Sequence, residues 1–152
     1  MRAATSDEDV IEIHRMLVYS MAAGAARAPV DADESMLFVY NTAKAKQGAV
    51  AMMAFLNGKF VGTLGLLETR YWYSKETFLR EVWLYVLPDY ENSDVMRSLL
   101  MEARALGDLL NKSVIIAPTA TGRQRGARRE HIATIYQYSP AGEIYAFHPR
   151  ES

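Results

Sequence analysis

Residues 84–103 read LYVLPDYENSDVMRSLLMEA, and this stretch decides the fold. The apolar run Leu84–Leu87 has strand character, and Pro88 stops it. A helix is predicted over Glu91–Leu110, because apolar residues recur there at helical spacing, namely Val95, Leu99, Ala103, Leu106 and Leu110, with Met96 and Leu100 widening the stripe. A short buried strand is predicted next, over Ser113–Ala117. A helix between two strands is typical of a crossover, so we expect these strands to be parallel neighbours in one sheet.

The chain before this stretch predicts an antiparallel sheet with two helices ahead of it. Asn57-Gly58 is a tight hairpin turn between the apolar runs Val50–Leu56 and Phe60–Leu67, because both turn residues tolerate positive φ. Phe78–Leu87 is the next strand. Further upstream we expect an edge strand in Met1–Thr5, a helix from Ser6 with Ser6 and Asp9 as a capping box, and a second helix from Asp31–Glu34 to about Lys46.

The chain after this stretch predicts a loop or short helix and then a hairpin. Thr119–Glu130 is rich in Gly and Arg, and the strands Ile132–Tyr138 and Glu143–Phe147 flank Ser139–Gly142. The resulting order is β-α-α-β-β-β-α-β-(α)-β-β. With 152 residues, we expect a single domain spanning 1–152.

Composition excludes several classes of protein. Hydrophobic residues make up 50% and charged residues 23% of the chain, as in ordinary globular domains and unlike disordered or collagen-like chains. There is no cysteine, so disulfides, thiolate nucleophiles and Cys-based zinc sites are excluded, and the three scattered histidines predict no metal site. We find no signal peptide and no membrane span in the sequence, so a cytoplasmic protein is expected.

Two segments resemble the GNAT superfamily of acyltransferases, which use acyl-CoA. Residues 1–9, MRAATSDED, are similar to the family's first strand and helix cap. Leu84–Tyr90 is similar to the family's fourth strand and the turn after it, and the match continues through Arg97–Leu100 and Ala103. The resemblance implies an α+β fold (an α/β-type mixed sheet) with six to seven strands and helices on both faces. It also implies acetyl-CoA as co-substrate, lying between the strand Val82–Leu87 and the strand Ser113–Ala117.

The resemblance assigns the cofactor contacts residue by residue. Main-chain groups around Tyr85, Val86 and Leu87 would hold the pantetheine. The turn from Asn92 to Met96 would hold the diphosphate, because a helix N-terminus presents N–H groups and a positive dipole end. The assigned residues are Tyr85, Val86, Leu87, Asn92, Ser93, Val95, Met96 and Arg97.

This turn departs from the family pattern. The family has a glycine-rich Arg/Gln-x-x-Gly-x-Gly turn, and the matching residues here are Glu91–Met96, ENSDVM, with both glycines replaced. Glu91 and Asp94 place negative charge where a diphosphate would lie. Two interpretations stand beside each other: weakened or lost CoA binding, or acids that stabilise the dipole of the helix.

Two catalytic residues are predicted. Glu81 lies in the middle of a strand, and we expect it to share a face with Trp83 and Tyr85. In a cleft beside aromatic rings its pKa would rise, which suits a general base for an amine. The alternative is an ion pair with Arg70 or Arg80. The resemblance also implies a tyrosine that protonates the leaving thiolate. Aligning the terminal hairpin puts that position on Ala133, and Tyr136 takes the role only in a different register.

Two surface features carry predictions about partners. The cluster Arg123, Arg125, Arg128 and Arg129 is either a phosphate-binding edge or a solvated loop. The run Tyr71-Trp72-Tyr73 exposes at least one ring if it lies on a strand, and this is typical of a dimer contact or of a lip beside a substrate, with simple packing on the sheet as the alternative.

The sequence leads to two hypotheses of function. The first is a divergent GNAT acyltransferase that moves an acetyl or related group from acyl-CoA to an amine on a small molecule, a protein or a nucleic-acid base, with a homodimer as a candidate assembly. The second is a non-catalytic GNAT-like binding or structural protein, such as a phage-encoded or virion-associated protein.

Overall fold

The computed structural model of the 152-residue chain describes residues 1–21, 30–45, 48–91 and 94–116. Its elements follow the predicted order up to the fifth strand. They are β1 (Arg2–Ala3), α1 (Asp7–Ser20), α2 (Ala32–Lys44), β2 (Ala49–Leu56), β3 (Lys59–Arg70), β4 (Thr77–Val86), a 3₁₀ helix (Pro88–Tyr90), α3 (Val95–Leu110) and β5 (Val114–Ile115).

The five strands form one mixed sheet in the order β1-β2-β3-β4-β5. β1 to β4 are antiparallel to their neighbours, whereas β5 pairs with β4 in parallel, as the crossover through α3 requires. The predicted turn between β2 and β3 is confirmed: Asn57 and Gly58 have φ of 51° and 79°, the left-handed conformation of a two-residue hairpin.

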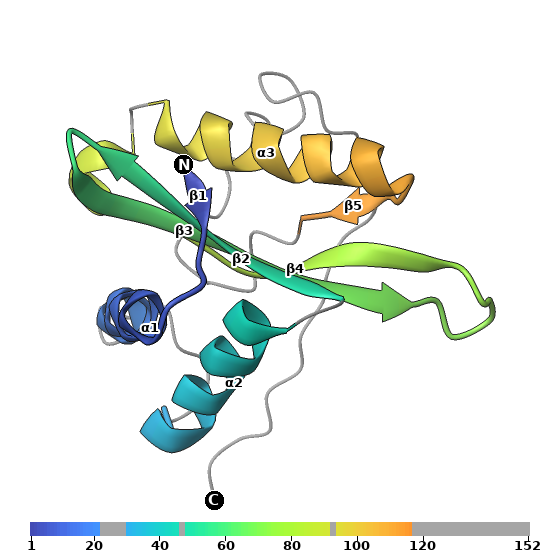
Figure 1. Cartoon of the computed structure of the whole chain (residues 1–152), viewed down its shortest axis with the longest axis horizontal. Coiled ribbons are helices and arrows are strands. Elements are labelled where there is room, and N and C mark those ends of the chain that lie inside the picture. Colours follow the sequence, from blue (N-terminus) through green and yellow to red (C-terminus); the bar gives the residue numbers. More distant parts are fainter. Residues whose placement is uncertain (22–29, 46–47, 92–93, 117–152) are drawn as a thin grey trace, which may run out of the picture.

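Helices cover both faces of the sheet. Figure 1 shows α3 along one face and α1 with α2 against the other. The core is accordingly divided in two by the sheet. One half lies under α3 around Leu64, Leu84 and Leu99, and the other lies under α1 and α2 around Ile13, Met53 and Tyr85.

The start of α1 is built as the sequence predicts. The Ser6 side chain accepts from the N–H of Asp9, and the Asp9 carboxylate accepts from the N–H of Ser6, which completes the capping box. Asp9 also receives two hydrogen bonds of 2.7 Å from the guanidinium of Arg2, which ties β1 to α1. These bonds hold the pKa of Asp9 well below its usual range.

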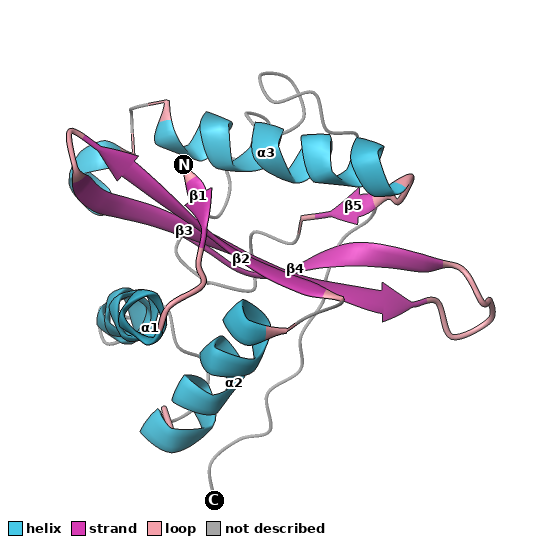
Figure 2. Ribbon diagram, viewed as in Figure 1, coloured by secondary structure: helices cyan, strands magenta, loops and turns pink. Residues whose placement is uncertain are grey.

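The predicted elements compare closely with those observed (Figure 2). The expected α+β fold with a mixed sheet is confirmed, and α3, with 16 residues, is the longest helix of the described part. α3 begins at Val95 and not at Glu91, because Pro88–Tyr90 forms a separate 3₁₀ helix before it. The predicted strands Ile132–Tyr138 and Glu143–Phe147 and the segment Thr119–Glu130 lie outside the described residues, so the described sheet has five strands where six to seven were expected.

Two further observations concern the described residues alone. None of their helices combines the length and apolar character that crossing a membrane requires. No group of three or more His, Asp or Glu side chains in this part of the chain is arranged to hold a metal ion.

A candidate functional site at the end of the β4–β5 pairing

The antiparallel pairing between β3 and β4 is interrupted at one residue of β4. β3 and β4 pair Gly65 with Trp83 and then Leu66 with Glu81, so that Val82 is an additional residue on β4. This is a β-bulge, which bends a strand and interrupts its ladder. On the opposite edge of β4, β5 pairs with Leu79 and Arg80. The bulge and the end of the described β4–β5 pairing therefore meet at Glu81.

Glu81 is buried at this point. Only 2% of the residue is exposed, and neither carboxylate oxygen has a hydrogen-bond partner among the described residues. The alternative predicted from the sequence, an ion pair with Arg70 or Arg80, is not among the salt bridges of the described part, whose cations pair with other acids. Buried carboxylates ordinarily have partners, so this one calls for an explanation.

Burial raises the pKa of Glu81 to about 8, and the positive charge of Arg80 opposes this shift only in part. The carboxyl group is consequently protonated over most of the range below neutral pH, and it loses its proton near the pH at which many enzymes work. A pKa in this region suits a group that takes a proton from an amine.

The predicted orientation of Glu81 is wrong. Opposite residues on paired strands share a face, and Glu81 lies opposite Leu66, which belongs to the core under α3. Trp83 and Tyr85 belong to the core under α1 and α2. The bulged residue Val82 adds one step to the alternation of the strand, and this places Glu81 on the other face from the aromatic rings.

The side chains of the second half of β4 are buried in the two cores. Tyr85 and Val86 are 1% and 0% exposed and lie on opposite faces, and Leu87 packs between both cores. Any contact of these residues with a ligand at the β4 edge would therefore use their main-chain groups, as the resemblance implies. The N–H of Leu87 is already bonded to the carbonyl of Val61, at 2.9 Å.

The N-terminus of α3 lies just beyond. The side chains of Val95 and Met96 are buried against the sheet, so these two residues can offer a ligand only their main-chain groups. The side chain of Arg97 is exposed. Asp94 is the N-cap residue, and its side chain makes no capping hydrogen bond. Glu91 follows the 3₁₀ helix and is not in the first turn of α3, so the interpretation that it stabilises the dipole of this helix is wrong.

Several predicted site residues lie outside the described part of the chain. These are Asn92 and Ser93 in the expected diphosphate turn, the candidate acid Tyr136 with its alternative Ala133, and the cluster Arg123, Arg125, Arg128 and Arg129. Their assignments remain predictions.

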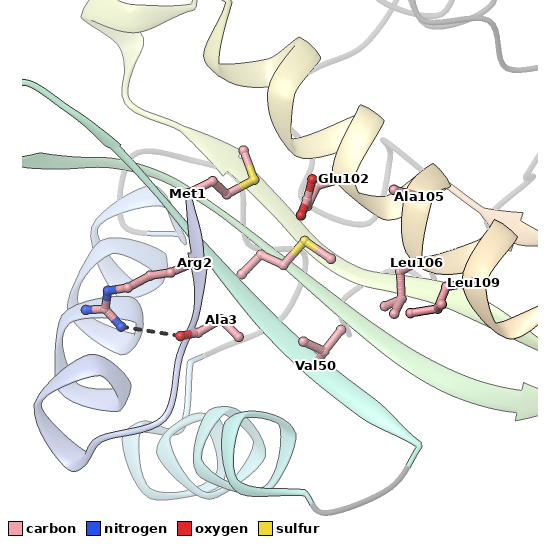
Figure 3. Close-up of a pocket in the computed structure, with 9 residues that line it drawn as sticks. Met1, Arg2, Ala3, Val50, Glu102, Ala105, Leu106 and Leu109 are labelled. Atoms are coloured by element: carbon pink, nitrogen blue, oxygen red, sulfur yellow. Dashed lines mark hydrogen bonds between the residues drawn. The ribbon is translucent and has the colours of Figure 1, made fainter.

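The structure also contains a shallow cavity that the sequence analysis did not identify. It has a volume of about 270 Å³ and lies between β1, β2 and the second half of α3 (Figure 3). Its walls are mainly apolar, with Glu102 at the helix side and the backbone of Arg2 at the strand side. This cavity is lined by none of the predicted site residues.

The bulge was the feature that sequence reasoning missed. Regular alternation of side chains was assumed along β4, and the register shift at Gly65/Leu66 breaks it. The signal was present in Gly65. A Cβ at this position would lie 2.5 Å from the Trp83 ring, so glycine is needed where the ring crosses β3.

Solved structures with the same fold are known. A ribosomal-protein-alanine N-acetyltransferase from Brucella melitensis biovar Abortus 2308 aligns over 99% of this chain and 96% of its own, with a TM-score of 0.70 and 15% identity. A predicted acetyltransferase from Clostridium acetobutylicum, solved with acetyl-CoA, aligns over 97% and 94% with a TM-score of 0.72 and 13% identity.

An aminoglycoside acetyltransferase from an uncultured soil sample, in complex with sisomicin, aligns over 99% of this chain and 95% of its own, with a TM-score of 0.67 and 11% identity. No protein-family model matches the sequence, and no curated protein matches it. At these identities the similarity establishes a shared fold, and the GNAT fold expected from the resemblance is confirmed.

Proposed function

We propose that this chain, a divergent protein with the fold of the GNAT N-acetyltransferases, transfers an acetyl or related acyl group from acyl-CoA to an amine. One observation carries the proposal. A buried carboxylate, Glu81, has no hydrogen-bond partner among the described residues, and it lies at the residue where the bulge of β4 meets the end of the β4–β5 pairing. A carboxylate kept there at the cost of its desolvation suits a general base.

The residues present fit acetyl-CoA in part. The described β4–β5 pairing comprises two residue pairs and β4 continues to Val86, so we place the pantetheine beside the main chain at Tyr85–Leu87, as the resemblance implies. The start of α3 suits the diphosphate through its N–H groups. Asp94, exposed and without a capping bond, opposes this with its negative charge. We therefore expect acetyl-CoA to bind weakly.

Acetyl-CoA supplies an activated thioester acetyl group, and the chain supplies proton transfer and positioning. Glu81, once deprotonated, takes a proton from the ammonium form of the acceptor, directly or through one water molecule, so that the free amine can attack the acetyl carbon. We propose Tyr136 as the group that returns a proton to the departing thiolate of CoA.

The acceptor is proposed at the level of an amine. Two of the solved relatives are named for amine acceptors of different kinds, an aminoglycoside and the alanine of a ribosomal protein. A small molecule, a protein terminus and a nucleic-acid base therefore all remain candidates for this chain, and a panel containing each class is the appropriate assay.

Calorimetric titration with acetyl-CoA tests the proposal first. We expect saturable binding, and we expect Asp94→Asn to tighten it about threefold to tenfold, because an exposed unit charge several ångströms from a diphosphate and screened by water contributes about 1 kcal/mol of repulsion. Asp108→Asn is the matched control, since Asp108 is exposed near the other end of α3. Release of free CoA in the presence of the amine panel then tests the transfer.

Absence of heat and of thermal stabilisation at millimolar acetyl-CoA, in both the parent and Asp94→Asn, would contradict the proposal and support the non-catalytic alternative. Binding that Asp94→Asn leaves unchanged would show instead that the diphosphate lies elsewhere.

A further inference from the structure

The β3–β4 hairpin ends in an exposed aromatic tip, which we define as Tyr71–Glu76. In Figure 1 the hairpin extends past both helical layers at the end of the molecule next to β5. Trp72 is 95% exposed and Tyr73 is 70% exposed, although rings of this size are ordinarily well buried. Contiguous exposed apolar patches mark interaction sites, whereas single scattered exposed apolar residues are ordinary.

The tip is an ordered structure. Tyr71 packs on the buried Phe78, with ring centroids 4.4 Å apart, and stacks on Tyr73 at 5.6 Å. Trp72 meets Tyr73 edge to face at 5.5 Å. The N–H of Ser74 bonds to the carbonyl of Tyr71, and the hydroxyl of Ser74 accepts from the N–H of Glu76. The exposed rings are therefore held in place before any partner arrives, which lowers the entropic cost of binding.

We propose that this tip binds the same tip of a second copy of the chain across a two-fold axis. The charges at its end are self-complementary: Lys75 and Glu76 are both exposed, and neither takes part in a salt bridge within the described part of the chain. A two-fold axis brings Lys75 against Glu76 of the partner subunit, and Glu76 against Lys75 of the partner subunit, while the Trp72 and Tyr73 rings pack between them.

The charge of the tip favours a second copy over nucleic acid. Lys75 and Glu76 cancel. At the base of the hairpin the cations are Arg70 and Lys112, and the charge of Lys112 is offset by its ion pair with Glu68. Binding of single-stranded nucleic acid combines aromatic stacking with a distinct excess of basic residues. A nearly neutral aromatic tip lacks that excess, whereas contact between two copies needs none.

The small area that two tips can bury limits the affinity of the dimer. A buried Tyr or Trp covers roughly 150–250 Å², so the two exposed rings of each copy contribute roughly 600–1,000 Å² in total. This is below the roughly 1,200 Å² of a standard stable interface. We therefore expect a reversible dimer with a dissociation constant on the order of 10 μM or weaker.

Sedimentation velocity across a wide concentration range tests this inference, which does not depend on acyl transfer. The parent should shift from monomer to dimer, and Trp72→Ala should weaken the dimer at least about tenfold. Tyr19→Ala is the control, because Tyr19 is also an exposed aromatic residue, 60% exposed, but lies on α1. It should dimerise like the parent.

A charge exchange tests the two-fold arrangement. Lys75→Glu and Glu76→Lys should each weaken the dimer about threefold to tenfold by setting like charges together, and the double variant should return to within about twofold of the parent. Fluorescence adds an independent readout: Trp83 is buried at 3% exposure, so a blue shift of the emission with rising protein concentration reports on Trp72.

A parent that stays monomeric at every concentration would overturn the inference. So would a dimer that Trp72→Ala leaves intact, or a shift of Trp72 emission that requires an oligonucleotide or phospholipid vesicles and not a higher protein concentration.

Discussion

At the scale of single residues, Glu81 has opposite effects on stability and on the proposed chemistry. Its pKa of about 8 in the folded chain lies above the 4.5 of an ordinary glutamate, so the folded protein binds more protons than the unfolded one between these values. The free energy of unfolding must therefore fall as the pH rises through this window, since the carboxyl group must ionise while buried.

Replacement of Glu81 by Gln separates the two effects. The variant should lose the pH dependence and be more stable than the parent at pH 8, by about 4 kcal/mol for a shift of this size. Its rate of acyl transfer should fall roughly 10²- to 10⁴-fold, and the rise of the parent's kcat/KM toward pH 8 should disappear. Urea denaturation and CoA-release assays at several pH values measure both.

Glu102→Gln is the control, because Glu102 is exposed on α3 and the substitution should change neither quantity. A Glu81→Gln variant that is active with an unchanged pH profile would show that the carboxylate is not the base.

That Glu81 lies in the middle of a strand was predictable from the sequence. Its face was not, because one additional residue at Val82 reverses it, and the trace of the bulge is Gly65 on the neighbouring strand, not the pattern of apolar residues on β4.

At the scale of elements, α3 and β5 are held together by a close backbone approach at Gly107. A Cβ at this position would lie 2.7 Å from Cγ2 of Val114 and 2.9 Å from the carbonyl oxygen of Lys112. The N–H of Lys112 also bonds to the carbonyl of Gly107, at 2.9 Å, so the chain turns back onto the sheet within a few residues. This contact sets the position of β5 beside β4.

Gly107→Ala should therefore destabilise the protein by about 1–3 kcal/mol, despite the better helix propensity of alanine, because a backbone oxygen cannot move aside cheaply. It should also weaken acetyl-CoA binding, since β5 forms one side of the proposed site. Thermal denaturation and calorimetry measure the two effects. Ser98→Ala, on the exposed side of the same helix, is the control and should change neither quantity. A Gly107→Ala variant as stable as the parent would contradict the close packing around Gly107.

The elements themselves were the most predictable part of the molecule. The residue types Asn57-Gly58 predict the hairpin, and the spacing of apolar residues from Val95 to Leu110 predicts the helix. Both signals are local, so tertiary contacts do not alter them. The first residue of α3 was predicted four positions early, because Pro88 starts a 3₁₀ helix whose polar residues resemble the first turn of an α-helix.

At the scale of the whole molecule, the paired strands of the sheet are separated by very different lengths of chain. β2, β3 and β4 pair with their sequence neighbours through short turns. β1 pairs with β2 across both N-terminal helices, with Arg2 opposite Met53, and β5 reaches β4 only after α3, with Val114 opposite Leu79. The proposed binding site depends on the second of these longer connections.

This arrangement has a consequence for the kinetics of folding. Short-range pairings form early, because closing a small loop costs little chain entropy, so the β2–β3–β4 meander should be structured in the transition state while β5 docks afterwards. A ligand that bridges β4, β5 and the start of α3 would then stabilise contacts absent from the transition state. Acetyl-CoA should slow unfolding in proportion to its binding energy and leave the folding rate nearly unchanged. Stopped-flow fluorescence of the buried Trp83 measures both rates; faster folding with acetyl-CoA would mean that the binding site is already formed in the transition state.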